Sequence, residues 1–415
     1  MSSEACWSRA YLSRVTRAGD VATWRAVESL GPAQALREVL PTLPSAHGWE
    51  EARRVAEDDL RRVRALGGRF VVPSDPEWPG GRWEGLNQLA GDAAHLGRRA
   101  AASPASPASP ASPDAGRDGL ARMAPPLGLW VRGSAGLGEL LGRSVAVVGS
   151  RAATAYGEHV AREMCFGLAE QGYCVVSGGA YGVDAAAHRG ALAARGSTVA
   201  VLAGGVDVLY PRGNAGLLQE VAARGGLVSE RPPGAPVGRE HFLVRNRLIA
   251  ALSAGVVVVE APARSGALAT ARRAAMMGLP VMAVPGPVTS AVSVGCHLLL
   301  REYAAVPVTC VEDVMEVVGD MGEQLSAWPQ GPRSARDGLS VEQRRMLDAA
   351  DPRRPMTLGA LARAAGVHRA ADARKCLAPL LARGLLAEIA GEPDGASGYR
   401  LTQRGVEDGS DRLGV

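Results

Sequence analysis

Two glycine-rich turns contain the residues of this sequence that are best suited to chemistry. Gly149-Ser150-Arg151 closes the apolar run 144–149, and Ser177-Gly178-Gly179 closes the apolar run 174–177. A buried strand, a small-residue turn and a helix start leave backbone N–H groups where a phosphate can sit. Two such turns, one with an arginine, predict a site for more than one phosphate. A nucleotide or a nucleic acid is therefore the first ligand to consider.

A later segment combines several arginines with one aromatic ring. It contains Arg239, Phe242, Arg245, Asn246 and Arg247, and the whole sequence has only three phenylalanines. Guanidinium groups bind phosphates, and an unstacked base gains about 1–3 kcal/mol from an aromatic face. The segment therefore predicts contact with a single-stranded nucleic acid. Two structural roles compete with this interpretation: Phe242 as a core anchor, and Arg247 as half of an ion pair.

Other polar residues lie at similar junctions. Ser265 and Gly266 begin a helix after another apolar run, and Glu230 and Glu260 each end one. Asp184 and His188 lie four residues apart, a spacing that a metal can use, although a helix-start carboxylate with a partner is the commoner explanation. The six cysteines never form a CxxC pair. We therefore expect no catalytic residue, no metal and no cofactor.

The elements that must position these residues alternate between strands and helices from 129 to about 320. Strands are expected over 144–149, 174–177, 198–203, 226–229, 256–260, 281–284 and 305–308. Helices are expected over 159–171, 184–195, 214–224, 245–253 and 266–277. Such alternation predicts an α/β fold with a doubly wound, mostly parallel sheet. Ligands of these sheets bind beyond the carboxyl ends of the strands, where the glycine turns lie.

Composition changes mark further regions on either side of this core. Residues 1–68 have a helical pattern, 69–325 form the α/β region, and a Ser-Pro-Ala insertion at 95–124 cannot form a helix or bury a core. A linker at 326–340 leads to 341–405, where three helices and two short strands make a winged helix the natural expectation. Arg369, Arg374 and Lys375 lie in or just before its third helix, and 406–415 form a tail.

Charge and hydropathy exclude several classes of protein. The net charge is only +4, from 46 basic and 42 acidic residues, so a nucleic-acid site must be local rather than spread over the whole surface. No run of about 18 uncharged apolar residues is present, and the N-terminus lacks a signal-peptide pattern. We therefore expect a cytoplasmic protein without a membrane partner.

Taken in order, the motifs resemble those of the DNA-processing protein DprA (Smf) family. The matching blocks are Gly149-Ser150-Arg151 with Tyr156-Gly157, 177–184, 205–211, Arg245-Asn246-Arg247, Ser265-Gly266 and Pro285-Gly286. The resemblance implies an extended Rossmann-like core with a helical, SAM-like N-terminal domain. It also implies a homodimer that binds single-stranded DNA and loads the RecA recombinase in natural transformation or recombination, without being an enzyme.

Matched position by position, the family's phosphate-binding arginine falls on Arg151, its second basic residue on Arg239 and its aromatic residue on Phe242. The sequence departs from the family pattern at Leu243-Val244 and at Cys296-His297. A homodimer contact is expected late in the core, at 298–300 and at Val311, Val314, Met315 and Val318, with burial inside the subunit as the alternative.

Two other functions compete. Nucleotide phosphoribohydrolases of the lysine-decarboxylase-like type have a related glycine turn followed by a carboxylate, but Arg273 stands at that position. An arginine there would repel the oxocarbenium-like charge of a glycosidic cleavage. A winged-helix transcription regulator is the second rival. Its third helix has few basic residues and contains Asp372, whereas duplex reading needs several base-contacting side chains.

Overall fold

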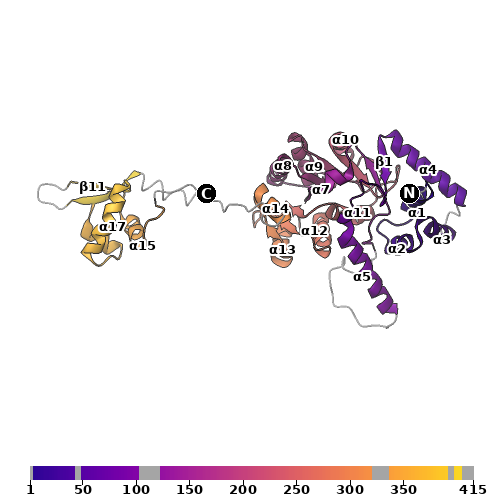
Figure 1. Ribbon diagram of the computed structural model, residues 1–415. Helices are drawn as coiled ribbons and strands as arrows, with labels where there is room; N and C mark the ends of the chain where they lie inside the picture. The colour runs from indigo at the N-terminus through magenta and orange to yellow at the C-terminus, as the bar shows by residue number, and fades with distance from the viewer. Residues whose placement is uncertain (1–2, 43–47, 102–121, 320–335, 391–396, 404–415) are drawn as a thin grey trace. The chain divides into compact units, whose positions relative to one another are not determined.

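A computed structural model describes residues 3–42, 48–101, 122–319, 336–390 and 397–403. Contacts divide the chain into two units, Met1–Ser326 and Ala327–Val415. Each unit is described by itself (Figure 1). Among the described residues, no helix is both long and apolar enough to cross a membrane.

The first unit is built around a nine-stranded sheet with the order β1-β2-β6-β5-β4-β3-β7-β8-β9. The pairs from β6 to β9 are parallel, whereas β1 and β2 pair antiparallel at one edge. The α/β fold with a mostly parallel sheet is thus confirmed. The strands are β1 (Gly68–Val71), β2 (Leu129–Arg132), β3 (Ser144–Val148), β4 (Cys174–Ser177), β5 (Thr198–Val201), β6 (Gly226–Ser229), β7 (Val256–Val258), β8 (Val281–Ala283) and β9 (Val306–Pro307).

The central strand β3 shows why these apolar runs form a sheet covered on both faces. Val145 and Val147 pack in one apolar cluster, and Ala146 and Val148 pack in another on the opposite face. Helices cover both faces, as Figure 1 shows for α8 and α9 against α11 and α12. The helices are α7 (Leu137–Gly142), α8 (Ala155–Glu170), α9 (Val183–Ala193), α10 (Ala215–Arg224), α11 (Arg239–Ala251), α12 (Gly266–Met276), α13 (Val294–Glu302) and α14 (Val311–Val318).

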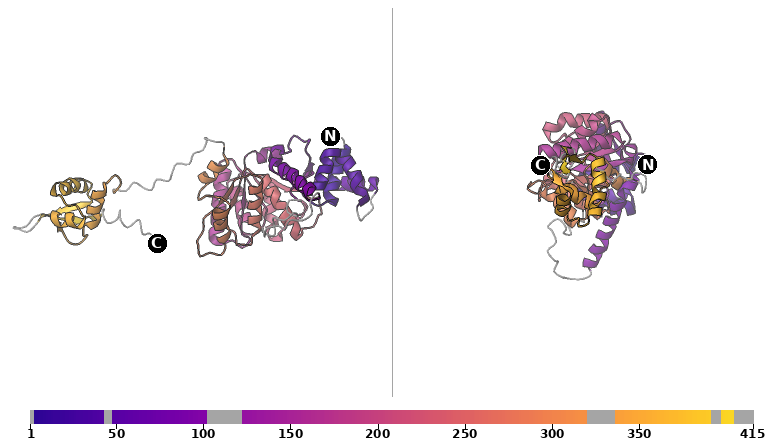
Figure 2. Two further views of the ribbon diagram at one scale, coloured as in Figure 1. Left: turned by 90° about the horizontal axis from the view of Figure 1, so that it is seen from below. Right: turned by 90° about the vertical axis from the view of Figure 1, so that its left-hand side faces the viewer.

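Four N-terminal helices share a core with the antiparallel edge of this sheet. They are α1 (Ser3–Val15), α2 (Val21–Leu30), α3 (Pro32–Val39) and α4 (Trp49–Ala65). Trp130 of β2 is fully buried, 4.4 Å from the ring of Phe70, in one cluster with Trp7 and Leu36. Two further views show these helices packed against the α/β core (Figure 2). The helices and the sheet edge therefore stabilise each other, and the domain boundary at residue 68 remains a prediction.

The second unit has its own apolar core. Helices α15 (Val341–Ala349), α16 (Leu358–Ala364) and α17 (Ala370–Ala382) pack around Met346, Leu361 and Leu380. Strands β10 (Met356–Thr357), β12 (Gly398–Leu401) and β11 (Leu386–Ile389) form an antiparallel sheet in that order. The linker at 326–340 falls largely on residues outside the described ranges, as does the 406–415 tail.

Three expectations about individual elements were wrong. The 95–124 insertion was expected to contain no helix and no core residues, but α5 (Glu84–Ala101) continues to residue 101, and Met123 and Ala124 are buried. The Ser-Pro-Ala repeat itself lies outside the described residues. The strand at 305–308 was expected to be buried, yet Val306 is 39% exposed because β9 is an edge strand. Helix α11 begins at Arg239 rather than Arg245, so the whole arginine segment is helical.

Buried His188 makes the stability of the first unit depend on pH. Its Nδ1 lies 2.7 Å from Thr198 Oγ1, and burial lowers its pKa from 6.5 to about 3. Below pH 6.5 His188 is protonated in the unfolded chain but not in the folded chain. The free energy of unfolding therefore decreases as the pH is lowered, until His188 is protonated in both states near pH 3. Between pH 7 and 5 we expect the free energy of unfolding to fall by about 2 kcal/mol more than in His188→Gln, measured by urea unfolding. Equal pH dependence in the two proteins would contradict a buried neutral imidazole.

Candidate nucleic-acid interface

A groove of about 1360 Å³ opens beyond the carboxyl ends of β3 and β7. These two strands are neighbours, and the chain leaves β3 toward β4 on one side but reaches β7 through α11 on the other. A parallel sheet with this change of direction leaves a crevice at its carboxyl edge. Three segments line the groove: 148–152 after β3, 237–249 in and before α11, and 262–272 leading into α12.

The turn after β3 forms the floor of the groove. Gly149 is required there, because a Cβ would lie 2.6 Å from the Val183 side chain. The Ser150 N–H donates to the Glu260 carbonyl at 2.7 Å, and the Ala152 N–H donates to Ser150 Oγ at 3.2 Å. The expectation that this turn presents free N–H groups is therefore wrong for these two donors.

Arg151 projects from this turn and is exposed. Its guanidinium carbon lies 4.9 Å from the centre of the Phe242 ring, so a cation–π contact holds the arginine at the groove. The structure thus brings Arg151 and Phe242 together, although the two residues lie far apart in the sequence.

The second glycine turn is filled by the protein's own side chains. Asp184 accepts from the Ala180 N–H at 3.3 Å, in the position that an external anion would otherwise take. Arg245 donates through Nη1 to the Gly178 carbonyl at 2.9 Å and also to the Val201 carbonyl. Ser177, Gly178 and Gly179 themselves do not line the groove; from this turn only Ala180 and Asp184 do.

Helix α11 forms one wall with Arg239, Phe242, Leu243, Arg245 and Asn246. Arg239 is exposed, whereas Arg245 is only 7% exposed and burial lowers its pKa to about 10. Asn246 donates through Nδ2 to the Gly266 carbonyl at 3.2 Å, which joins this wall to the start of α12. On this wall, exposed Arg239 is therefore available to contact a ligand, whereas Arg245 is buried and has a structural role.

Arg247 points away from the groove into the core. Its Nη2 lies 2.7 and 2.8 Å from the two carboxylate oxygens of Glu230, and the arginine is fully buried. Glu230 also accepts from the Gly19 N–H at 3.3 Å. The competing structural interpretation of Arg247 is the one this geometry supports, and Glu230 is its ion-pair partner rather than an acid–base group of the groove.

The opposite wall begins with Ser265 and Gly266. Ser265 caps α12 by accepting from the Ala267 N–H at 3.2 Å. Arg264 and Arg272 also line this wall, and sequence reasoning missed both. The position of Arg264 directly before the Ser265-Gly266 helix start was an available signal. Tyr210, from the loop between β5 and α10, completes the rim and was also missed.

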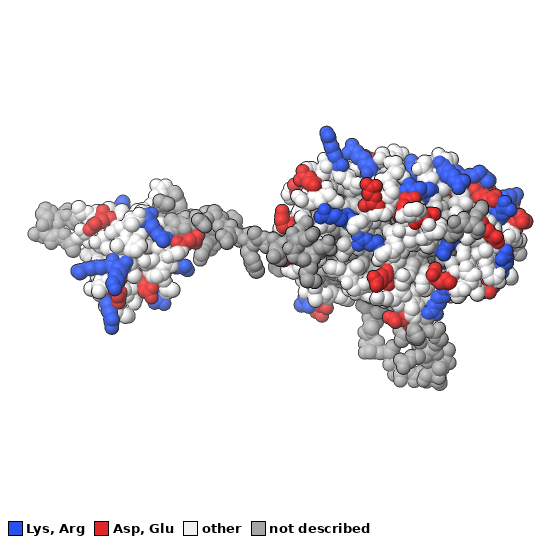
Figure 3. All heavy atoms as spheres, in the orientation of Figure 1, with Lys and Arg blue, Asp and Glu red and all other residues white. Residues whose placement is uncertain are grey.

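Positive charge is therefore concentrated in the groove rather than over the molecule. Figure 3 shows basic and acidic side chains intermixed on the visible face of the first unit. In the groove, Arg151, Arg239, Arg264 and Arg272 face a lining whose one carboxylate is the buried Asp184. Within the described residues, no ion pair involves any of these four arginines. Such a site favours an anion with several charges.

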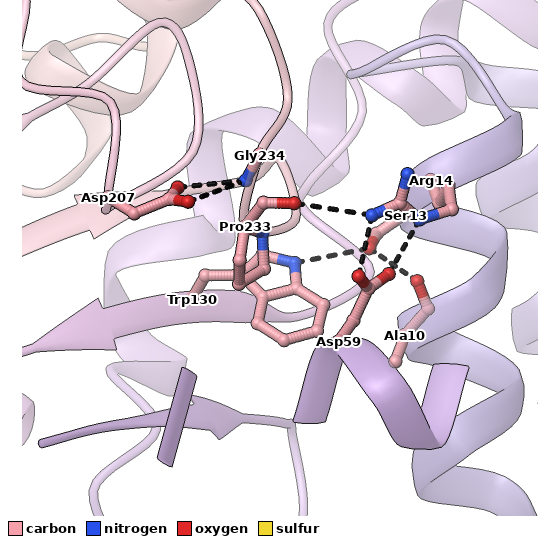
Figure 4. Close-up of polar contacts among 8 residues, drawn as sticks. All are labelled: Ala10, Ser13, Arg14, Asp59, Trp130, Asp207, Pro233 and Gly234. Carbon is pink, nitrogen blue, oxygen red and sulfur yellow. Dashed lines mark hydrogen bonds and ion pairs between the residues drawn. The ribbon is translucent and has the colours of Figure 1, made fainter. Parts of the chain in front are cut away.

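The loop that leads into α11 is braced by the N-terminal helices (Figure 4). Arg14 of α1 forms two 2.6 Å contacts with buried Asp59 of α4, and its Nη2 donates to the Pro233 carbonyl at 3.2 Å. One residue later, the Gly234 N–H donates to the Asp207 carboxylate at 2.8 and 2.9 Å. These contacts fix the entry of α11 and thereby the position of Arg239.

The remaining polar residues have structural partners. Glu260 accepts from the Thr154 N–H at 2.9 Å and from Thr154 Oγ1 at 2.6 Å, which fixes the start of α8. Arg273 donates to the Ala269 carbonyl at 3.1 Å and is not part of the groove lining. Across the described residues, no three His, Cys, Asp or Glu side chains gather as metal ligands would.

The residues expected at a dimer contact are divided between core and surface. Leu299 and Val314 are buried within the subunit, while Leu300, Val311, Met315 and Val318 are partly buried against its apolar clusters. The dimer contact remains a prediction.

Comparisons with known proteins agree on one family. A family described as "DNA recombination-mediator protein A" matches residues 117–319. The chain is 41% identical over 403 residues to the putative DNA processing protein DprA of Mycobacterium tuberculosis, covering 96% of this chain and 94% of that protein. It is 43% identical over 198 residues to protein Smf of Escherichia coli, covering 48% of this chain and 52% of that protein. The X-ray structure of DprA from Streptococcus pneumoniae has a TM-score of 0.54 at 28% identity, covering 75% of this chain and 96% of that one.

Proposed function

Because the chain belongs to the DprA (Smf) family of DNA-processing proteins, we propose that its groove binds single-stranded DNA without strong sequence preference. The observation that carries this proposal is a set of four arginines that have no carboxylate partner among the described residues and line one groove with the half-buried Phe242: Arg151, Arg239, Arg264 and Arg272. Arginines at this density suit a chain of phosphates better than a single one.

The Phe242 ring favours a single strand over a duplex as the ligand of the groove. In a duplex, each base is stacked on both faces, so no face is available to a side chain in the groove. In a single strand the bases can turn toward Phe242 while the phosphates contact the arginines. Arginines contact phosphates whatever the sequence, and an aromatic face can stack on any base, which favours sequence tolerance.

We also propose a partner and an assembly state for the protein. The protein acts in the cytoplasm as a homodimer that delivers single-stranded DNA to a RecA recombinase, in natural transformation or in recombination more generally, and has no catalytic activity of its own. Its second unit is a winged-helix domain, supported by three helices and a three-stranded antiparallel sheet. Exposed Arg374 and Lys375 on α17 lie beside exposed Asp372, so we assign this domain to protein contacts rather than to base reading.

Salt dependence of binding tests the proposed ligand. With an oligo(dT) probe, we expect the logarithm of the binding constant to fall linearly with the logarithm of salt concentration, with a slope of about 0.7 per phosphate contact. Arg239→Gln should reduce that slope by about 0.7, because one phosphate contact is lost. Fluorescence anisotropy at several salt concentrations measures both quantities.

Arg189→Gln is the matched control, because Arg189 is an exposed arginine on α9 outside the groove lining. Its slope should equal that of the unchanged protein. Competition with duplex DNA of the same length should displace the probe only weakly. A binding constant unaffected by salt, or a duplex that competes as well as the single strand, would overturn the proposal.

A further inference from the structure

The ring of Phe242 is surrounded by other side chains of the protein. The Arg151 guanidinium lies 4.9 Å from its centre, and the Arg245 guanidinium lies 5.9 Å from it. The Tyr210 ring lies 5.8 Å away, tilted by 52°. Two cations and a second ring therefore already occupy the space around Phe242. A base can reach this ring only where these neighbours leave part of it uncovered.

Tyr210 presents the more accessible ring. It is 47% exposed and lines the groove, whereas Phe242 is half-buried. The 52° tilt means that Phe242 does not stack flat on the Tyr210 ring, and the 47% exposure of Tyr210 leaves part of that residue accessible. Nor does its hydroxyl form a hydrogen bond with any described residue. A large exposed ring whose hydroxyl has no hydrogen-bond partner among the described residues, at the edge of a cationic groove, is suited to stacking.

A second exposed aromatic ring lies on a neighbouring loop. Tyr181, on the loop between β4 and α9, is 49% exposed. The two loops touch: a Cβ on Gly213, three residues after Tyr210, would lie 2.6 Å from the Tyr181 hydroxyl oxygen. Asn214 fastens them by donating through Nδ2 to the carbonyls of Gly179 and Ala180 at 3.1 and 3.0 Å. Tyr181 is thus held against the loop that carries Tyr210, directly after Ala180 of the groove lining.

We propose that Tyr210 stacks on a second base beside the one at Phe242, and that the DNA strand leaves the groove across the β5–α10 loop toward Tyr181. Within this arrangement, Phe242 also holds Arg151 and supports Tyr210. The ligand class is an unpaired base, which offers a π-face whatever its identity. The inference rests on the proposed function, because it assumes that single-stranded DNA occupies the groove.

Two substitutions at one position separate stacking from other effects. Tyr210→Leu keeps an apolar side chain but removes the ring, and Tyr210→Phe keeps the ring but removes the hydroxyl. With an oligo(dT) probe carrying one 2-aminopurine, we expect Tyr210→Leu to weaken binding about 5- to 150-fold and Tyr210→Phe to remain within about twofold of the unchanged protein. The salt slope should stay the same in both, because no phosphate contact is lost.

The strand path is tested by the length of the probe. Tyr181→Leu should weaken binding of a long oligo(dT) but not of one just long enough to fill the groove. Tyr156→Leu is the control, since Tyr156 is 43% exposed and lies outside the groove lining. An equal loss of affinity for both probe lengths would show that the DNA strand does not pass Tyr181.

Photocrosslinking of the unchanged protein to oligo(dT) containing 5-iododeoxyuridine gives a result that does not depend on any variant folding. We expect a crosslink to Tyr210. Binding by Tyr210→Leu equal to that of the unchanged protein, an equal loss in Tyr210→Phe, or crosslinks to Phe242 without Tyr210 would each overturn the inference. Failure of the unchanged protein to bind any single strand would instead overturn the proposed function.

Discussion

Replacing Glu230 with leucine is expected to lower the free energy of unfolding of the first unit by about 3–5 kcal/mol. The change leaves the Arg247 guanidinium fully buried without its carboxylate partner. It also removes the acceptor of the Gly19 N–H. A charge that is buried and unpaired is among the most costly defects in a protein interior. Urea unfolding followed by tryptophan fluorescence measures the loss.

Two control variants separate the buried charge from other effects of the change. The double variant Glu230→Leu with Arg247→Met should recover most of the stability, because neither charge then remains in the core. Glu240→Ala breaks the 3.1 Å pair of Glu240 with Arg122, in which the glutamate side chain is 64% exposed, and should lower the free energy of unfolding far less, because solvent screens an exposed pair. A loss in the Glu230 variant no larger than that in the Glu240 variant would show that the pair contributes little.

Replacing Arg151 with alanine should weaken binding of single-stranded DNA by about 1.5–3 kcal/mol, which corresponds to about 10- to 150-fold. Arg151 is the one charged residue of the turn that forms the groove floor, and the Phe242 ring holds its guanidinium at 4.9 Å. A charge-assisted hydrogen bond to a phosphate oxygen would be lost with it. Fluorescence anisotropy at fixed salt gives the affinity directly.

Arg151→Lys is the informative companion variant. It keeps the charge but loses the planar group that stacks on Phe242 and grips a phosphate through two donors, so it should recover only part of the affinity. The stability of both variants should change little, because Arg151 is exposed and has no ion-pair partner among the described residues. Full affinity in a folded Arg151→Ala would show that the arginine only shapes the rim.

The sequence predicted those groove residues that directly follow a strand in the chain. Gly149, Arg151, Ser265 and Gly266 follow apolar runs directly, so the carboxyl edge of a parallel sheet brings them together. Arg239 and Phe242 were chosen for their residue types and their three-residue spacing, although the helix that carries them was expected to begin only at Arg245. These positions follow from local pattern and the geometry of parallel sheets.

The incorrect predictions concern residues whose role depends on a partner far away in the sequence. Nothing near Gly178 indicates that Asp184 and Arg245 fill its turn, and the partner of Arg247 comes from the end of a different strand. The N–H of Ser150 is taken by the carbonyl of Glu260, which lies more than a hundred residues away in sequence. The antiparallel strands β1 and β2 were missed because their apolar runs are short and are separated by α5.

The shared core of the N-terminal helices and the sheet edge has a consequence for synthesis on the ribosome. Helices α1 to α4 emerge before several of the apolar side chains that cover them, among them Trp130, Leu202, Leu218 and Leu227. At about 5–20 residues per second, these partners are translated on the order of ten seconds later. During that interval the helices present an uncovered apolar face to the surrounding solution, so the newborn protein is most exposed to chaperones and to aggregation before its groove exists.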